Sequence, residues 1–253
     1  MKLNYKEFGS GRPMIILHGL LGSLDNWQSL ARRYGEKFHV FSVDQRNHGQ
    51  SPHSDEMTFE AMVQDLLEFI QDHNIEKPVL LGHSMGGKTA MAFAFKHPEL
   101  ISGLIVADIS PKTYKVHHRE ILDALTSVDF ATVKDRRTVE DQLMLRLGDR
   151  SVVLFLAKNV YWKQDGKLAY RFNLNAIDKN IEAISAWPFR YEIYSGNTLF
   201  IKGDQSNYIR DDDPSIGQHF PNSRIMTIHG AGHWVHAEKP DDMYRVVYQY
   251  MMS

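Results

Sequence analysis

The sequence predicts an α/β fold in which a mostly parallel central sheet is flanked by helices and carries an inserted helical segment. Short apolar runs alternate with amphipathic helical patterns, which is typical of strands joined by crossover helices. The chain has 253 residues, of which 43% are hydrophobic, so it can bury a sizeable core within one domain. A charged, helix-patterned stretch at residues 112–187 interrupts the alternation.

Two helices and six strands are the clearest elements. One helix begins after Thr58, a residue type favoured as an N-cap, and repeats apolar residues along one face. The last helix follows Pro240 and carries Asp241 and Asp242 in its first turn. The predicted strands are residues 13–17, 38–43, 78–81, 104–107, 198–201 and 224–228.

The interrupting stretch is predicted to be a helical lid, because a structureless loop of this length is uncommon inside a compact domain. We therefore expect residues 1–111 and 188–253 to form the core and residues 112–187 to form the lid. The lid could simply cover an apolar edge, or it could shape a substrate pocket and exclude water. The pocket interpretation is favoured, because the chain leaves the sheet after residues 108–111, at the edge expected to hold the nucleophile.

A G-x-S-x-G pattern at residues 82–86 supplies that nucleophile. Such a pattern arises often by chance, but here residues 79–81 predict a buried strand before it and residues 88–95 predict a helix after it. A sharp strand-to-helix turn strains its central residue, and small neighbours let the turn close while the hydroxyl projects outward. Ser84 is the candidate nucleophile.

A serine hydroxyl needs a histidine base, and that base needs a carboxylate to fix its tautomer. Thirteen histidines compete for the role. His233 is favoured, because it lies in a glycine-rich loop after the last predicted strand, in the chain order nucleophile, acid, histidine. His229 and His236 are its rivals, and the three mimic a helical metal-binding spacing. Gly230 and Gly232 disfavour a helix there, so no metal site is expected.

Two aspartates at strand ends are candidates for the carboxylate. Asp108 directly follows residues 104–107, and Asp204 follows a later strand. Asp108 ranks first, because its strand is expected beside that of Ser84, within reach of a histidine from the last loop. It could instead be a turn residue before a proline, and Asp204 remains the alternative.

The loop at residues 18–22, His-Gly-Leu-Leu-Gly, is predicted to complete an oxyanion hole. Such a turn can aim the backbone N–H of Leu20 at the same point as the N–H of Met85. His18 is expected to hold this loop by hydrogen bonds rather than to act as a base. The polar segment at residues 44–51 is expected to be a buried polar turn.

Aromatic side chains are candidate walls of the substrate pocket. Phe155, Trp162 and Trp187 in the predicted lid, and Trp234 beside the candidate base, could line it. Aromatic residues in a lid also commonly form the core of the lid itself.

Composition excludes several classes of partner. Lys and Arg total 29 against 31 Asp and Glu, which leaves no broad positive field for nucleic acid. The chain has no cysteine, and therefore no disulfide, thiol nucleophile or cysteine-ligated metal. The first residues do not show the pattern of a secretory signal, and no apolar run reaches the roughly 20 residues that span a bilayer. We expect a cytoplasmic protein without membrane insertion, and composition leaves its oligomeric state open.

Four motifs, taken in order, resemble the α/β-hydrolase superfamily over essentially the whole chain. They are H-G-x-x-G at residues 18–22, D-x-R-x-H-G-x-S at 44–51, G-H-S-M-G-G at 82–87 and G-H-W at 232–234. More narrowly, residues 82–91, 108–111, 171–174 and 232–236 are similar to the YbfF-type bacterial esterases.

The resemblance to the YbfF-type esterases also helps to identify the carboxylate that orients the histidine base. In most serine hydrolases of this layout the carboxylate lies three residues past the glycine that ends the strand after the lid, and this chain has Ser206 there. In the YbfF-type group the acid follows the strand before the lid, which supports Asp108 and explains Ser206.

The resemblance implies a serine hydrolase that needs no cofactor and acts on small acyl esters, or on thioesters such as acyl-CoA. Two other reactions reuse the same scaffold, namely carbon–carbon bond hydrolysis and cofactor-free perhydrolysis. A ligand receptor with low turnover is the alternative outside enzymes, and the full set of Ser84, His233, acid and oxyanion loop argues against it.

Overall fold

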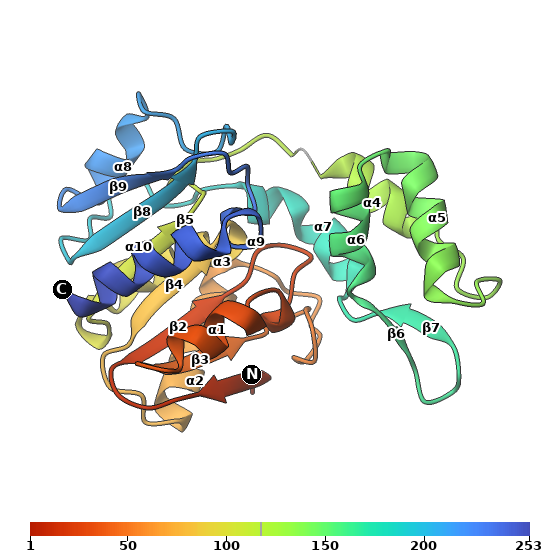
Figure 1. Ribbon diagram of the computed structural model, residues 1–253, viewed down its shortest axis with the longest axis horizontal. Coiled ribbons are helices and arrows are strands. Elements are labelled where there is room, and N and C mark those ends of the chain that lie inside the picture. The colour runs from red at the N-terminus through yellow and green to blue at the C-terminus, as the bar shows by residue number, and fades with distance from the viewer. Residues whose placement is uncertain (117) are drawn as a thin grey trace.

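The computed structural model describes residues 1–116 and 118–253, and it confirms the predicted fold class (Figure 1). Seven strands form one sheet in the order β1-β3-β2-β4-β5-β8-β9. All neighbours are parallel except β1, which runs antiparallel to β3. The strands are β1 (Tyr5–Phe8), β2 (Pro13–Leu17), β3 (His39–Val43), β4 (Val79–His83), β5 (Gly103–Ala107), β8 (Thr198–Gly203) and β9 (Ser223–Ile228).

Helices cover both faces of this sheet (Figure 1). Within β2, Met14 and Ile16 belong to one buried cluster, while Ile15 and Leu17 belong to the other, as the two-residue period of a strand requires. The first cluster includes residues of α1 (Gln28–Tyr34) and α10 (Pro240–Met252), and the second includes residues of α2 (Phe59–Asp72) and α3 (Met85–Lys96). Short helices η1 (Leu24–Asn26), η2 (Pro98–Leu100), α8 (Pro214–His219) and α9 (Val235–Glu238) lie in the connections.

The predicted helix starts agree with the structure. Thr58 is the N-cap of α2 and accepts a hydrogen bond from the N–H of Ala61 at 3.2 Å, which satisfies one of the free donors of the first turn. Pro240 is the first residue of α10. The edge strand β1 was not among the predicted strands, because its four residues show no apolar run.

Residues between β5 and β8 form a separate group of helices beside the sheet (Figure 1). Position 117 in this stretch lies outside the described residues, and the 112–187 boundaries of the lid remain an expectation. Among the described residues, no helix is both long and apolar enough to span a membrane. The elements are α4 (Arg119–Thr126), α5 (Arg136–Leu147), α6 (Arg150–Ala157), the hairpin β6 (Val160–Trp162) and β7 (Leu168–Tyr170), and α7 (Leu174–Ser185).

Candidate active site

Ser84 occupies the turn between β4 and α3 and has φ 52° and ψ −118°. This is a strained conformation for a residue with a side chain. Two glycines make the turn possible. A Cβ on Gly82 would lie 2.2 Å from the carbonyl oxygen of Gly86, and one on Gly86 would lie 2.4 Å from that of Leu17. The sequence pattern at residues 82–86 is thus explained by close backbone approach.

Asp108 follows β5 at the same edge of the sheet as Ser84. Residues His83 and Ala107 are register partners in β4 and β5, and the N–H of Ser84 donates to the carbonyl of Ala107 at 3.1 Å. Asp108 is fully buried and also has a positive φ, of 51°. Its carboxylate accepts hydrogen bonds from the N–H of Gly203 at 3.2 Å, from the hydroxyl of Ser206 and from Nδ1 of His233 at 2.8 Å.

His233 comes from the loop after β9, and its imidazole is held on several sides. Asp108 bonds Nδ1, and Tyr208 stacks on the ring with centroids 3.9 Å apart and an interplanar angle of 18°. The backbone carbonyl of His233 accepts a hydrogen bond from Nε2 of His83 at 2.9 Å. Burial keeps the pKa of His83 well below its usual value. A neutral His83 adds no positive charge beside the candidate base.

Asp204, the alternative acid, lies in a different environment. It is exposed, and its carboxylate bonds Nδ1 of His229 at 3.0 Å and the N–H of Gly230 at 2.8 Å. These hydrogen bonds, with that of His229 the larger contribution, lower the pKa of the Asp204 carboxyl. The structure therefore gives two aspartate–histidine pairs, and the one that includes His233 uses Asp108.

The turn at residues 18–22 lies directly against the nucleophile. A Cβ on Gly19 would lie 3.2 Å from Cβ of Ser84 and 2.8 Å from Nδ1 of His83, so only glycine fits there. Met85 is the first residue of α3, so its N–H has no acceptor within the helix. The N–H of Leu20 donates to no backbone or side-chain acceptor among residues 1–116 and 118–253. Leu20, Ser84 and Met85 line one small cavity.

Two buried histidines hold this turn, as expected for His18. Its Nε2 accepts from the N–H of Gln45 at 3.0 Å, and Nε2 of His48 accepts from the N–H of Leu21 at 3.0 Å. Burial lowers the pKa of His18 to about 4 and that of His48 to about 3. Both rings are therefore neutral near pH 7, as an accepting nitrogen requires.

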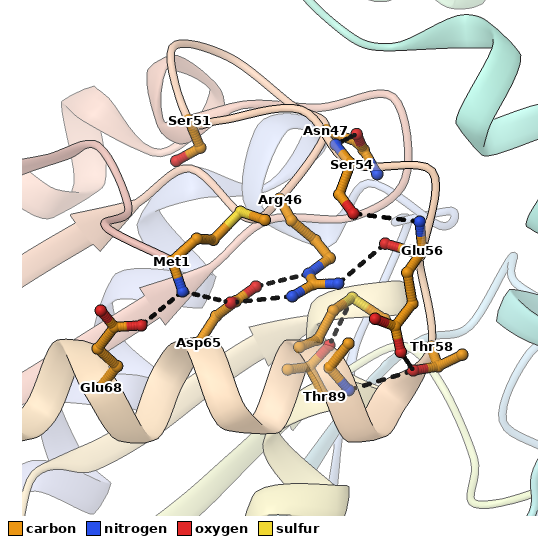
Figure 2. Close-up of polar contacts among 12 residues, drawn as sticks. Met1, Arg46, Asn47, Ser51, Ser54, Glu56, Thr58, Asp65, Glu68 and Thr89 are labelled. Atoms are coloured by element: carbon orange, nitrogen blue, oxygen red, sulfur yellow. Dashed lines mark hydrogen bonds and ion pairs between the residues drawn. The ribbon is translucent and has the colours of Figure 1, made fainter.

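The segment at residues 44–51 is the buried polar turn that the sequence predicts, and Figure 2 shows how it is anchored. Nε of Arg46 donates to Asp65 of α2 at 2.6 Å, and a second guanidinium nitrogen donates to the other carboxylate oxygen at 3.0 Å. A third nitrogen of Arg46 donates to the carbonyl of Glu56 at 2.9 Å. A buried bidentate ion pair of this kind fixes the relative positions of its two side chains. Here it supports the loop that carries His48.

A cavity of about 260 Å³ opens beside Ser84 and His233. The predicted wall residues Phe155 and Trp234 both line it, with ring centroids 5.4 Å apart. The remaining wall is mostly apolar and comes from the turn at residues 18–22 and from α4 and α6. The lining residues are His18, Gly19, Leu20, Leu21, Gly22, Asn26, Trp27, His83, Ser84, His118, Ile121, Val152, Phe155, Leu156, Tyr208, His233, Trp234 and His236.

Two predicted wall residues are corrected. Trp162 lies in the β6–β7 hairpin and is 58% exposed, because this hairpin projects away from the sheet (Figure 1). Trp187 lies in the segment returning to the sheet and packs against Phe95 and Phe189, with centroids 5.9 and 5.0 Å away. Neither lines the cavity among the residues that the structure describes.

Sequence reasoning missed Tyr208 and Trp27 as parts of the site. Tyr208 stacks on His233 from a loop 25 residues earlier, and Trp27 stacks on His236 at 4.2 Å. No local pattern distinguishes either residue, because their role depends on contacts between loops. Within the described ranges, 1–116 and 118–253, no group of three or more His, Cys, Asp or Glu side chains is arranged to hold a metal ion.

The chain is similar to known proteins in both sequence and structure. A family model described as alpha/beta hydrolase fold matches residues 12–240. The chain is 40% identical to the sn-1-specific diacylglycerol lipase ABHD11 of Danio rerio, over 96% of this chain and 80% of that protein. It is 36% identical to Esterase YbfF of Escherichia coli (strain K12), over 99% of both chains. A solved marine microorganism esterase superposes with a TM-score of 0.95 at 42% identity, covering 98% of each chain.

Proposed function

The chain belongs to the alpha/beta hydrolase fold family, and we propose that it is a serine esterase with Ser84 as nucleophile. His233 acts as the base and Asp108 as the acid that orients it. The single observation that carries the proposal is the 2.8 Å bond between buried Asp108 and Nδ1 of His233, since His233 lines a cavity together with Ser84. Similarity to an esterase and to a diacylglycerol lipase over nearly the full chain supports the same reaction class.

Hydrolysis proceeds in two acyl-transfer steps. Asp108 keeps the proton of His233 on Nδ1, so that Nε2 takes the proton from the Ser84 hydroxyl as its oxygen attacks the carbonyl carbon. The N–H groups of Leu20 and Met85 bind the oxyanion. Collapse expels the alcohol, which takes the proton from His233. Water then repeats the sequence on the acyl-enzyme and releases the carboxylic acid. A thioester reacts in the same way, with a thiol as leaving group.

The two halves of the substrate occupy different cavities. His233 must reach the leaving oxygen, so the alcohol lies in the cavity of about 260 Å³ that His233 lines. A second cavity, of about 30 Å³, shares Ser84 and Leu20 with the first and includes Met85 but not His233. We assign the acyl group to this smaller cavity.

The helices of residues 119–185 act as a lid over the larger cavity. Ile121 of α4, and Val152, Phe155 and Leu156 of α6, supply an apolar wall opposite the turn at residues 18–22. An apolar wall excludes water, which strengthens the hydrogen bonds to the oxyanion. Carbon–carbon bond hydrolysis and perhydrolysis would use the same serine, and an assay panel with a diketone and with peroxide separates them from ester hydrolysis.

The nucleophile is tested by Ser84→Ala with p-nitrophenyl acetate as substrate. Loss of the attacking oxygen should lower kcat by about 10⁶-fold, while the circular dichroism spectrum stays that of the wild type. Ser102→Ala is the matched control, because Ser102 is an exposed serine before β5, and it should retain full activity. Full activity in Ser84→Ala would overturn the proposed function.

A further inference from the structure

The small cavity assigned to the acyl group holds a buried lysine. Lys88 is 2% exposed and lines this cavity together with Ser84 and Met85. It lies one helical turn after the nucleophile, and its N–H donates to the carbonyl of Ser84 at 3.0 Å. Helical side chains tilt toward the helix N-terminus, so the side chain of Lys88 runs back toward the serine.

Lys88 has backbone partners but no counter-ion. Nζ donates to the carbonyls of Ser185 at 2.8 Å and Ala186 at 3.0 Å, at the end of α7. An ammonium group has three donors, and the Phe59 and Tyr114 ring centroids lie 5.8 and 5.2 Å from Nζ, so one N–H faces aromatic rings rather than a hydrogen-bond acceptor. Across the described part of the chain no carboxylate forms an ion pair with Nζ, and the residues lining the cavity include no Asp or Glu. Burial alone lowers the pKa of Lys88 to about 7.

A buried ammonium without a counter-ion is costly, and lysine is almost never fully buried unless it is paired. An anion that entered the cavity would supply the missing charge and raise the proton affinity of Lys88. Met85, at the N-terminus of the twelve-residue helix α3, adds the positive end of the helix dipole beside the same cavity.

The size of the cavity limits what the anion can be attached to. Its volume of about 30 Å³, against about 260 Å³ for the cavity that His233 lines, favours a short acyl group over a long one. The rest of the wall combines apolar and aromatic side chains, such as Ile109, Ile184 and Tyr114, with the polar residues His118 and Ser185 and the exposed cation Lys115.

We infer that Lys88 binds a carboxylate at the far end of a short acyl group, so that half-esters of short dicarboxylic acids are a preferred substrate class. The inference rests on the proposed esterase function and on the assignment of the acyl group to the smaller cavity. The acyl-enzyme on Ser84 then carries its free carboxylate against Nζ, and the leaving alcohol lies in the larger cavity.

The test compares two esters that differ only in charge, benzyl hemisuccinate and its neutral analogue benzyl succinamate, with benzyl alcohol release followed by chromatography. The wild type should favour the hemisuccinate in kcat/KM. Lys88→Gln keeps an N–H donor group for the carbonyls of Ser185 and Ala186 but removes the charge. The ratio of kcat/KM for the charged over the neutral ester should fall by about 10- to 100-fold in this variant.

Lys96→Gln is the matched control, because Lys96 ends the same helix and is exposed, and it should leave the ratio unchanged. An equal loss on both esters in Lys88→Gln would make Lys88 only a positioning residue for the end of α7 and would overturn the inference. The inference would also be overturned if the wild type showed no preference for the hemisuccinate, or if it cleaved p-nitrophenyl acetate but neither benzyl ester. Failure to cleave any of the three esters would instead overturn the proposed function itself.

Discussion

The Asp108–His233 and Asp204–His229 pairs have the same chemistry in two different settings. In both, an aspartate directly after a core strand bonds Nδ1 of a histidine from the region after β9, at 2.8 and 3.0 Å. Asp108 is fully buried and its histidine lines the cavity with Ser84, whereas the His229 side chain is 86% exposed. An exposed ion pair contributes little, because water and salt screen it.

An aspartate–histidine bond alone therefore does not define a catalytic pair. The buried pair has a fixed orientation, since Asp108 also accepts from Gly203 and Ser206 and Tyr208 stacks on His233. The exposed pair lacks any such enclosure on the histidine side. Of the two similar contacts, the buried Asp108–His233 contact is the candidate for orienting a base, because it is enclosed and has further hydrogen-bond and stacking partners.

The largest effect is expected when the buried pair is broken. Asp108→Asn removes the charge that holds His233 in the required tautomer, and kcat for p-nitrophenyl acetate should fall by about 10⁴-fold. Asparagine tolerates the positive φ of this position, so the fold should persist. Steady-state kinetics with a thermal melt measures both, and activity near that of the wild type would remove Asp108 from the proposed mechanism.

A smaller effect is expected when the carboxylate is moved rather than removed. The hydroxyl of Ser206 reaches the same carboxylate oxygen of Asp108 that bonds His233. Asp108→Asn combined with Ser206→Asp should therefore recover at least about tenfold in kcat over Asp108→Asn alone. Single-turnover rates of the two variants give the comparison. No recovery would mean that the acid is effective only at the end of β5.

Buried and exposed imidazoles should also differ in how they affect the pH dependence of the free energy of unfolding. Burial, with a smaller effect of His233, lowers the pKa of His236 to about 3, against about 6.5 in the unfolded chain. Between these values only the unfolded state binds the proton, so the free energy of unfolding falls as pH drops from about 6.5 toward 3. The contribution of His236 is fully present above pH 6.5.

His236→Phe keeps the ring stacked on Trp27 but cannot titrate. Urea unfolding from pH 7 to 4 should show a pH slope that is lower by up to about 1.4 kcal/mol per pH unit. His53→Phe, at an exposed position where the imidazole contacts the backbone carbonyl of Arg171 rather than a carboxylate, is the control and should keep the slope of the wild type. Equal slopes in all three proteins would show that His236 is not neutral in the folded state.

The smallest effect is expected at the exposed pair. Asp204→Asn leaves the Asp108–His233 bond untouched and should change kcat by less than about twofold, because surface ion pairs contribute little. The same p-nitrophenyl acetate assay measures this. A loss as large as that of Asp108→Asn would reverse the assignment of the two aspartates.

Much of the fold could be predicted from local patterns. Buried strands such as β2 and β4 are continuous apolar runs, and Thr58 and Pro240 mark helix starts through rules that involve only neighbouring residues. The elbow around Ser84 is only partly local, since Gly82 lies against Gly86 within the turn whereas Gly86 lies against Leu17 of β2. β1 was missed because its sequence Tyr-Lys-Glu-Phe contains no apolar run, and β6 and β7 were missed because each has only three residues within a stretch of mostly helical pattern.

The cavity walls could not be predicted in the same way. Trp162 and Trp187 are aromatic, as pocket walls often are, but their positions depend on the direction of the β6–β7 hairpin and of the segment that returns from α7 to the sheet. Tyr208 and Lys88 carry no local signal either, because their surroundings come from segments distant in the chain. Sequence identifies the residue types, and packing between segments decides what each one touches.

Local sequence patterns were enough to place six core strands in chain order and to mark the turn that carries Ser84, and the order of motifs along the chain favoured His233. Tertiary packing selects which aspartate bonds His233 and which lies in solvent. Asp108 and Asp204 both follow core strands, and they differ in the loops that cover them. Burial is a property of the assembled loops, which no short stretch of sequence contains.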